Sequence, residues 1–176
     1  MTHTILQVDE DFVADNLLAI KNLLLDAYEG DFSEEDWRHT YGGARFLGTV
    51  NSEIVSHGAV VPREILINDQ RFLVGYLEAI AVASKVQGQG IGSQLLSTIS
   101  EFCASRYQIS MLSTDEFNFY SNFGWKQFKG KSGVFIDDQV ILTPDEDEGL
   151  MYLIGKAGFS QEILTAYCDP RAGDHW

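Results

Sequence analysis

The residues best suited to chemistry form a glycine-rich segment, Gln87 to Ser93, with the sequence Gln-Gly-Gln-Gly-Ile-Gly-Ser. An apolar run over residues 76–83 precedes it, and apolar residues at helical spacing follow from residue 91. This order predicts a strand, a glycine loop and a helix start. The first amides of a helix have no partner inside the helix, and glycines let a ligand approach the backbone closely. We therefore expect a phosphorylated cofactor to bind here.

Spacing separates the glycine loops that bind phosphates. A Walker loop needs a lysine directly after Gly92, which is absent. A dinucleotide fingerprint needs a third glycine where Ser93 stands, and the strand expected at 108–114 is not followed by further strand–helix–strand repeats. Gln87, Gly90 and Gly92 instead give the pattern Gln-x-x-Gly-x-Gly, which resembles the acetyl-coenzyme A loop of the GCN5-related N-acetyltransferases (GNAT). A turn that only reverses the chain remains the alternative.

The surrounding pattern predicts an α/β (α+β) fold with a mixed central sheet. An amphipathic helix is expected over residues 11–28, followed by a second helix that Ser33 caps. Turn dipeptides between strand patterns predict an antiparallel N-terminal meander, and a helix between two parallel strands predicts a βαβ unit, which by the GNAT resemblance would bind acetyl-CoA. The expected strands are 44–50, 53–67, 70–83, 108–114, 133–142 and 150–155, and the further helices are 91–106 and 116–124.

Length and composition favour one domain over residues 1–176, with 45% hydrophobic residues and no linker or repeat. Neither a signal peptide nor an apolar run long enough for a membrane span is evident, so a cytoplasmic protein is expected. Two cysteines, Cys103 and Cys168, stand without a Cys-x-x-Cys pair or a histidine cluster. We expect free thiols and no metal site.

The net charge is strongly negative, at -14, from 26 acidic and 12 basic residues. Such a field repels nucleic acids and anionic membranes. The acids cluster over residues 29–36 and 145–148 and near the C-terminus. A solvated acidic surface is one explanation, whereas convergence of these loops on a cleft would attract a polycation.

Five segments carry a closer resemblance. They are similar, in order along the chain, to the aminoglycoside 2'-N-acetyltransferases, a family of the GNAT superfamily. The segments are Gly30–Trp37 (Gly-Asp-Phe-Ser-Glu-Glu-Asp-Trp), Gly75–Glu78 (Gly-Tyr-Leu-Glu), Tyr120–Trp125, Thr143–Asp147 and the ending Asp169–Trp176 (Asp-Pro-Arg-Ala-Gly-Asp-His-Trp). The resemblance implies the GNAT fold, a homodimer and direct transfer of acetyl from acetyl-CoA to the antibiotic in a ternary complex, which confers resistance.

The resemblance also implies roles for single residues. Glu78 acts on the reacting amine through water, Tyr120 protonates the departing thiolate, and the Val82 amide polarises the thioester oxygen. Cofactor contacts are implied for Ile80, Val82, Gln87, Gly88, Gln89, Gly90, Ile91, Gly92 and Ser93. Substrate contacts are implied for Asp31, Asp36, Glu78, Ser113, Asp147, Asp174 and the carboxylate of Trp176.

Three departures accompany the match. The stretch between Ser113 and Tyr120 is shorter than in the family, the acidic turn with Asp147 is longer, and Ala79 stands where a glycine is expected. None of them removes a proposed catalytic group. Among the histidines, His57 lies in an expected strand and is more typical of a packing residue than of a catalytic dyad.

The chemistry accounts for these residue types. An aminoglycoside amine is mostly protonated near neutral pH, so a base must remove a proton before it attacks a thioester, and carboxylates hold the remaining ammonium groups. Simpler interpretations remain: Glu78 as a solvated acid, Tyr120 as a core aromatic, and a frayed tail. Two other functions also stay open, an acetyltransferase for another polyamine or a cell-wall amino sugar, and a non-catalytic acetyl-CoA or polyamine sensor.

Overall fold

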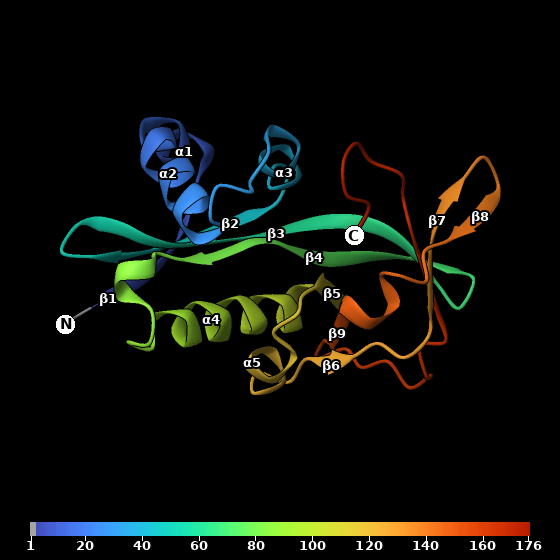
Figure 1. Cartoon of the computed structure of the whole chain (residues 1–176). Coiled ribbons are helices and arrows are strands. Elements are labelled where there is room, and N and C mark those ends of the chain that lie inside the picture. Colours follow the sequence, from blue (N-terminus) through green and yellow to red (C-terminus); the bar gives the residue numbers. More distant parts are fainter. Residues whose placement is uncertain (1–2) are drawn as a thin grey trace. The chain divides into compact units, whose positions relative to one another are not determined.

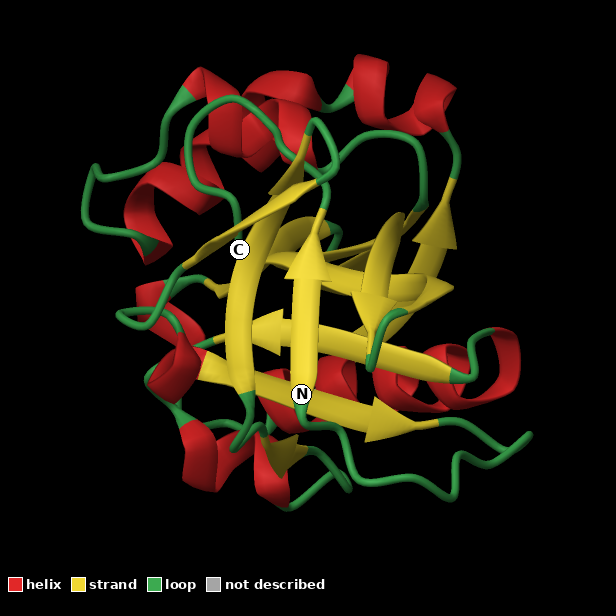
Figure 2. Ribbon diagram, turned by 90° about the vertical axis from the view of Figure 1, so that its right-hand side faces the viewer, coloured by secondary structure: helices red, strands yellow, loops and turns green. Residues whose placement is uncertain are grey.

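The computed structural model describes residues 3–176, and its strands join into one mixed sheet flanked by helices (Figure 2). Contacts between residues divide the chain into two compact units. The first unit comprises residues 3–61 and Glu78–Ile99, and the second comprises Pro62–Leu77 and Ser100–Trp176. The expected mixed α/β architecture is confirmed, whereas one domain over residues 1–176 stays a prediction.

In the first unit, helices cover both faces of the strands: α1, α2 and α3 lie on one side of β2 and β3, and α4 lies on the other (Figure 1). Strands β1 and β2 pair antiparallel, as do β2 and β3. The elements are β1 (His3–Val8), α1 (Glu10–Asp15), α2 (Leu17–Ala27), α3 (Glu34–His39), β2 (Ala44–Val50), the first part of β3 (Glu53–Ile67), the last part of β4 (Gln70–Val82), η1 (Ser84–Val86) and the start of α4 (Ile91–Arg106).

Side-chain caps explain where the early helices begin. Asp9 accepts a bond from the Phe12 amide at 2.9 Å, so α1 starts at Glu10. The single helix expected over residues 11–28 is wrong, because Asn16 leaves helical geometry and separates α1 from α2. The expected cap at Ser33 is confirmed as a capping box with Asp36.

The core of the first unit has two apolar clusters. Trp37, Leu24 and Leu47 belong to the cluster that joins the N-terminal helices to β2. Val86 and Ile91, on either side of the glycine loop, belong to the other. The loop is therefore anchored in packed side chains at both of its ends.

The second unit contains the remaining strands, and β4 pairs parallel with β5 at Gly75 and Tyr76. This confirms the βαβ unit, because α4 connects these two parallel strands. Strand β9 pairs antiparallel with β5, and β10 lies between β3 and β7. The elements are β5 (Ile109–Ser113), α5 (Phe117–Ser121), β6 (Lys126–Gln127), β7 (Lys131–Ile136), β8 (Gln139–Leu142), η2 (Asp147–Gly149), β9 (Leu150–Ile154) and β10 (Thr165–Cys168).

Three hairpin turns share one geometry, with two successive residues at positive φ and no glycine. The turns at Asn51–Ser52 and Asn68–Asp69 agree with the expected strand boundaries. The third, Asp137–Asp138, splits the strand expected at 133–142 into β7 and β8, so that expectation is wrong. Paired positive φ values are typical of type I′ turns, which match the twist of the joined strands.

Candidate active site

The glycine loop of the first unit has the geometry of an anion site. The first bond of α4 runs from the Gln94 amide to the Gly90 carbonyl at 3.1 Å, so the amides of Ile91, Gly92 and Ser93 precede the helical ladder. Gly88 and Gly90 have φ of +74° and +83°, and a Cβ on either would meet no atom within 4 Å. The space and the donors both fit phosphates, as the sequence predicts.

The strand that leads into this loop is irregular. Ala79 has φ of +52°, a left-handed conformation rare for a residue with a Cβ. Glu78, which precedes it, and Ile80, which follows it, are half-buried. The side chains that hold the backbone carbonyls of this stretch are His57 on Ala79 (2.7 Å), Tyr28 on Ile80 (3.2 Å) and Gln87 on Val82 (3.2 Å).

His57 belongs to a buried polar group behind Ala79. Arg45, which is 2% exposed, lies with Nη1 3.0 Å from Nε2 of His57. Arginine only donates, so His57 accepts at Nε2 and donates from Nδ1 to the Ala79 carbonyl. Burial is the main cause that lowers the pKa of His57 to about 3; the bond to Ala79 opposes this, and the Arg45 charge adds to it. His57 is therefore neutral at working pH, in agreement with the expected packing role.

Acidic side chains of the first unit gather around Tyr28. Burial is the largest cause that raises the pKa of Tyr28 to about 12, and the charges of Glu78 and Asp36 add to it. Asp36 also has a structural task, since its Oδ2 accepts bonds from the amide and hydroxyl of Ser33 at 2.7 and 2.8 Å. Asp31 is exposed, and its amide bonds the Tyr28 carbonyl at 2.9 Å. The charges of Asp36 and Glu78 thus act on one phenol that the sequence did not single out, whereas Asp31 is linked to Tyr28 only through its backbone amide.

In the second unit, Tyr120 lies near the end of α5 and is buried at 8% exposure. Its ring meets Phe119 and Trp125 edge to face, with centroids 5.5 and 6.4 Å away. Trp125 is fixed in turn by a bond from Nε1 to Ser100 at 2.8 Å. The Tyr120 ring therefore has one packed position. Ser113 is the exposed last residue of β5.

The acids of the acidic turn in the second unit have different surroundings. Asp147 accepts a bond from the Ser132 amide at 2.6 Å, which ties the turn to β7. The pKa of Glu146 is raised, first by burial and then by the negative charges of Asp174 and Asp145, while His175 opposes the rise. Glu146, which the sequence did not single out, is thus the acid of this turn that shares its electrostatic surroundings with Asp174.

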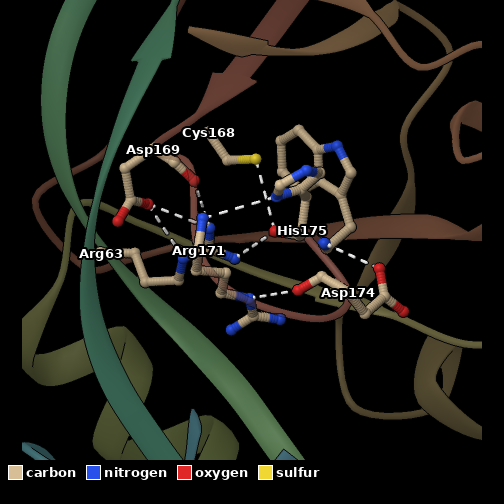
Figure 3. Close-up of polar contacts among 7 residues, drawn as sticks. Arg63, Cys168, Asp169, Arg171, Asp174 and His175 are labelled. Carbon is tan, nitrogen blue, oxygen red and sulfur yellow. Dashed lines mark hydrogen bonds and ion pairs between the residues drawn. The ribbon is translucent and has the colours of Figure 1, made fainter. Parts of the chain in front are cut away.

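The C-terminal segment is held in place rather than frayed (Figure 3). Arg63, on β3, donates to Oδ1 of Asp169 from Nε at 3.1 Å and from Nη2 at 3.0 Å, and to the His175 carbonyl from Nη1 at 2.8 Å. Trp176 is 4% exposed and donates from Nε1 to Thr143 at 3.1 Å, and its amide bonds Asp174 at 3.2 Å. Asp174 itself stays exposed.

Other classes of site find less support. Both cysteines are buried free thiols, and burial is the main cause that raises the pKa of Cys103 to about 12. Among residues 3–176 no group of three or more His, Cys, Asp or Glu side chains could hold a metal ion. No helix in the same range is long and apolar enough to cross a membrane.

Sequence reasoning missed Tyr28, Arg45 and Arg63. Tyr28 closes an amphipathic helix pattern and gives no polar signal. A buried arginine cannot be told from an exposed one by its type alone. Alternation along the end of β3 would have placed Arg63 on the buried side, but the burial of β2 does not alternate around Arg45.

Comparison with known proteins identifies a family model and a relative that match this chain. The model of a GNAT acetyltransferase domain matches residues 13–128. An aminoglycoside 2'-N-acetyltransferase from Mycolicibacterium fortuitum is 33% identical over 161 residues, which cover 89% of this chain and 83% of that protein.

Solved structures show the same fold at low identity. A GNAT N-acetyltransferase from Escherichia coli in complex with CoA has a TM-score of 0.69 at 16% identity, covering 94% of this chain and 89% of that one. A GNAT acetyltransferase from Brucella melitensis in complex with acetyl-CoA has a TM-score of 0.65 at 15% identity, with 97% of each chain covered.

Proposed function

The chain belongs to the GNAT acetyltransferase family, and from this premise we propose that it transfers acetyl from acetyl-CoA to the 2' amine of aminoglycosides. The observation that carries the proposal lies within the first unit. Strand β4 leads directly from an acidic group around Tyr28 to a loop built for phosphates. One end suits a polycation and the other a polyanion, which is the combination that this reaction requires.

The glycine loop would hold the co-substrate. The amides of Ile91, Gly92 and Ser93 would bind its phosphates, and the open space at Gly88 and Gly90 lets them approach. This local attraction has to overcome a net charge of -14, which repels a polyanion at long range. Donors fixed by a packed helix are effective in that role, because they need no rearrangement.

The reaction would run by direct attack. Glu78 takes a proton from the substrate ammonium through water, and the free amine attacks the thioester carbon. The Val82 amide stabilises the developing oxyanion; a carbon–nitrogen bond forms as the carbon–sulfur bond breaks. Tyr120 gives its proton to the departing thiolate, and the proton that the amide nitrogen loses restores the phenol. Asp31, Asp36, Ser113, Asp147, Asp174 and Trp176 would contact the antibiotic.

Kanamycin B and kanamycin A form a matched test, because the first has an amine at 2' where the second has a hydroxyl. Thiol release from acetyl-CoA is measured with each, and the product is located by NMR. We expect turnover of kanamycin B at 2' and little of kanamycin A, since a hydroxyl is the weaker nucleophile at neutral pH.

Other results would separate the alternatives. Equal acetylation of kanamycin A would refute the position of transfer. Turnover of spermidine or glucosamine alone would favour another natural amine. Acetyl-CoA binding without any turnover would favour a sensor.

We also propose that the protein acts in the cytoplasm as a homodimer that uses no metal. The resemblance to the aminoglycoside 2'-N-acetyltransferases supports the dimer, and the need for acetyl-CoA supports the location. Light scattering on the purified protein measures the mass in solution, and a monomer at micromolar concentration would contradict the dimer.

A further inference from the structure

A strained residue lies at the centre of the proposed site. Ala79 has φ of +52° between Glu78 and Ile80. An L residue in this region is strained and persists only where its surroundings determine it. The identity of those surroundings therefore bears on how the site is built.

One side chain holds Ala79 directly. Nδ1 of His57 lies 2.7 Å from the Ala79 carbonyl oxygen, and His57 is fully buried with 0% exposure. The bond fixes the peptide plane between Ala79 and Ile80. Because successive peptides share their Cα atoms, fixing this plane also limits the directions available to the Glu78 side chain and to the Ile80 amide.

The histidine has no freedom to turn away. Arg45 donates to its Nε2 and, from Nη2, to the Thr40 carbonyl at 3.2 Å. The guanidinium also lies over the Trp37 ring, 4.7 Å from its centroid, and 5.4 Å from that of Tyr41. Stacked and hydrogen-bonded in this way, Arg45 fixes both the ring orientation and the tautomer of His57.

We propose that His57, oriented by Arg45, is a positioning residue that holds Ala79 in its left-handed conformation and thereby aligns Glu78 and the amides of Ile80 and Val82. The inference rests on the proposed function, because it assigns those groups to substrate and acetyl-CoA. His57 exchanges no proton in the reaction. Its contribution is the shape of β4 at the point where the acetyl group is expected.

The test combines two substitutions at His57 with one at Ala79. His57→Leu removes the donor, whereas His57→Asn keeps one, because the Asn Nδ2 can occupy the place of the histidine Nδ1. Ala79→Gly removes the backbone strain that the bond from His57 would counter, since glycine adopts positive φ without strain. Acetyl-CoA affinity by calorimetry, and kcat and KM for kanamycin B, are measured for each variant and for the double variant His57→Leu/Ala79→Gly.

In the parent protein, His57→Leu should weaken acetyl-CoA binding about tenfold and lower kcat, whereas His57→Asn should stay within about threefold of the parent. In the Ala79→Gly variant the same His57→Leu change should cost less than about threefold. That dependence on residue 79 is the signature of positioning, because loss of packing alone would be the same in both backgrounds.

Equal losses in the two backgrounds, or equal losses with Leu and Asn, would overturn the proposal and leave His57 a packing residue. Should His57→Leu fail to fold, His57→Gln replaces it, because its longer amide extends toward Arg45 and leaves the Ala79 carbonyl without a donor. Acetyl-CoA affinity does not depend on the second substrate. A failure to acetylate aminoglycosides would therefore refute the proposed function while this series still decides the role of His57.

Discussion

Arg45 in the first unit and Arg63 in the second are both buried, at 2% and 5% exposure, but their partners differ in kind. Arg45 bonds a neutral histidine and a carbonyl and lies over two aromatic rings, with no ion pair in the described part of the chain. Burial lowers its pKa, against the opposing effect of Glu10. Arg63 instead pairs with Asp169 at 3.0 Å.

For Arg63, nearby negative charge outweighs burial in its effect on the pKa. Burial alone would lower the pKa of Arg63, but the negative charge of Asp169, helped by Cys168 and Tyr76, raises it. Arg63 therefore holds the C-terminal segment through an ion pair with Asp169, while Arg45 orients the His57 side chain through a hydrogen bond to an uncharged ring. The hydrogen bonds that Arg45 donates go to uncharged groups, whereas those of Arg63 include an ion pair, and removing one member of such a pair leaves the other charge without its partner.

The largest expected effect comes from removing the charged support. Arg63→Met leaves Asp169 and two carbonyls without their donor, so the free energy of unfolding in urea should fall by about 3 kcal/mol. Arg71→Met is the matched control. Arg71 pairs with Glu64 at 3.4 Å, but its side chain is 62% exposed, so a loss below about 0.5 kcal/mol is expected.

The same variant has a local reporter. Cys168 lies beside this support, with Sγ 3.4 Å from the His175 carbonyl, whereas Cys103 lies in α4. A thiol reagent should react slowly with both in the wild type, because burial raises both pKa values. Arg63→Met should accelerate labelling of Cys168 and leave Cys103 unchanged. Equal acceleration at both would show general unfolding instead of a released tail.

A second, smaller effect follows from His57, the uncharged partner of Arg45. His57 has a pKa of about 3 in the fold and an ordinary value of about 6.5 when unfolded, so below pH 6.5 the unfolded chain binds more protons. Its contribution to stability is complete above pH 6.5 and falls as the pH drops. Between pH 7 and 5 the wild type should lose about 2 kcal/mol more than His57→Asn. Parallel stability curves would contradict a neutral buried histidine.

Two glycines, one in each unit, give a third comparison. Gly90 and Gly158 both have positive φ, +83° and +78°, and both have open space where a Cβ would stand. An alanine at either should cost about 1 kcal/mol of stability. Only Gly90→Ala should weaken acetyl-CoA binding in calorimetry, by about tenfold. Unchanged affinity would remove the glycine loop from the proposed cofactor site.

The smallest effect concerns charge at the acidic turn. Glu146 shares its surroundings with Asp174, and Glu148 is exposed nearby. Glu146→Gln should raise KM for kanamycin B about threefold with kcat unchanged, because it removes attraction for a cation. Glu148→Gln should change KM less. The reverse order would place the substrate on the other side of the turn.

Local patterns predicted the parts of the fold that depend on neighbours in sequence. The cap at Ser33, the turn at Asn51 and the helix start at Ile91 were all predicted, because each depends on a few adjacent residues. Strand β10 was not predicted, since its pairing with β3 and β7 joins residues far apart in the chain.

The same limit applies to the candidate site. Glu78 and the glycine loop were identified from motifs, and the chemistry proposed for them follows from residue type. The Ala79 conformation and the bond from His57 depend on which residues of two neighbouring strands face each other. Spacing along one chain does not contain that register, so the support of the site could only be read from the structure.

Substitutions in the three hairpin turns should raise the thermodynamic stability of the protein. Ser52, Asp69 and Asp138 each occupy the second turn position at φ of +67°, +63° and +61°, where a side chain is disfavoured. Glycine is the preferred residue there, and relief of this strain is worth some tenths of a kcal/mol at each turn. None of the three belongs to the residues assigned to catalysis or binding. Glycine at these three positions should therefore give a more thermostable enzyme, which would tolerate more destabilising substitutions at the candidate site.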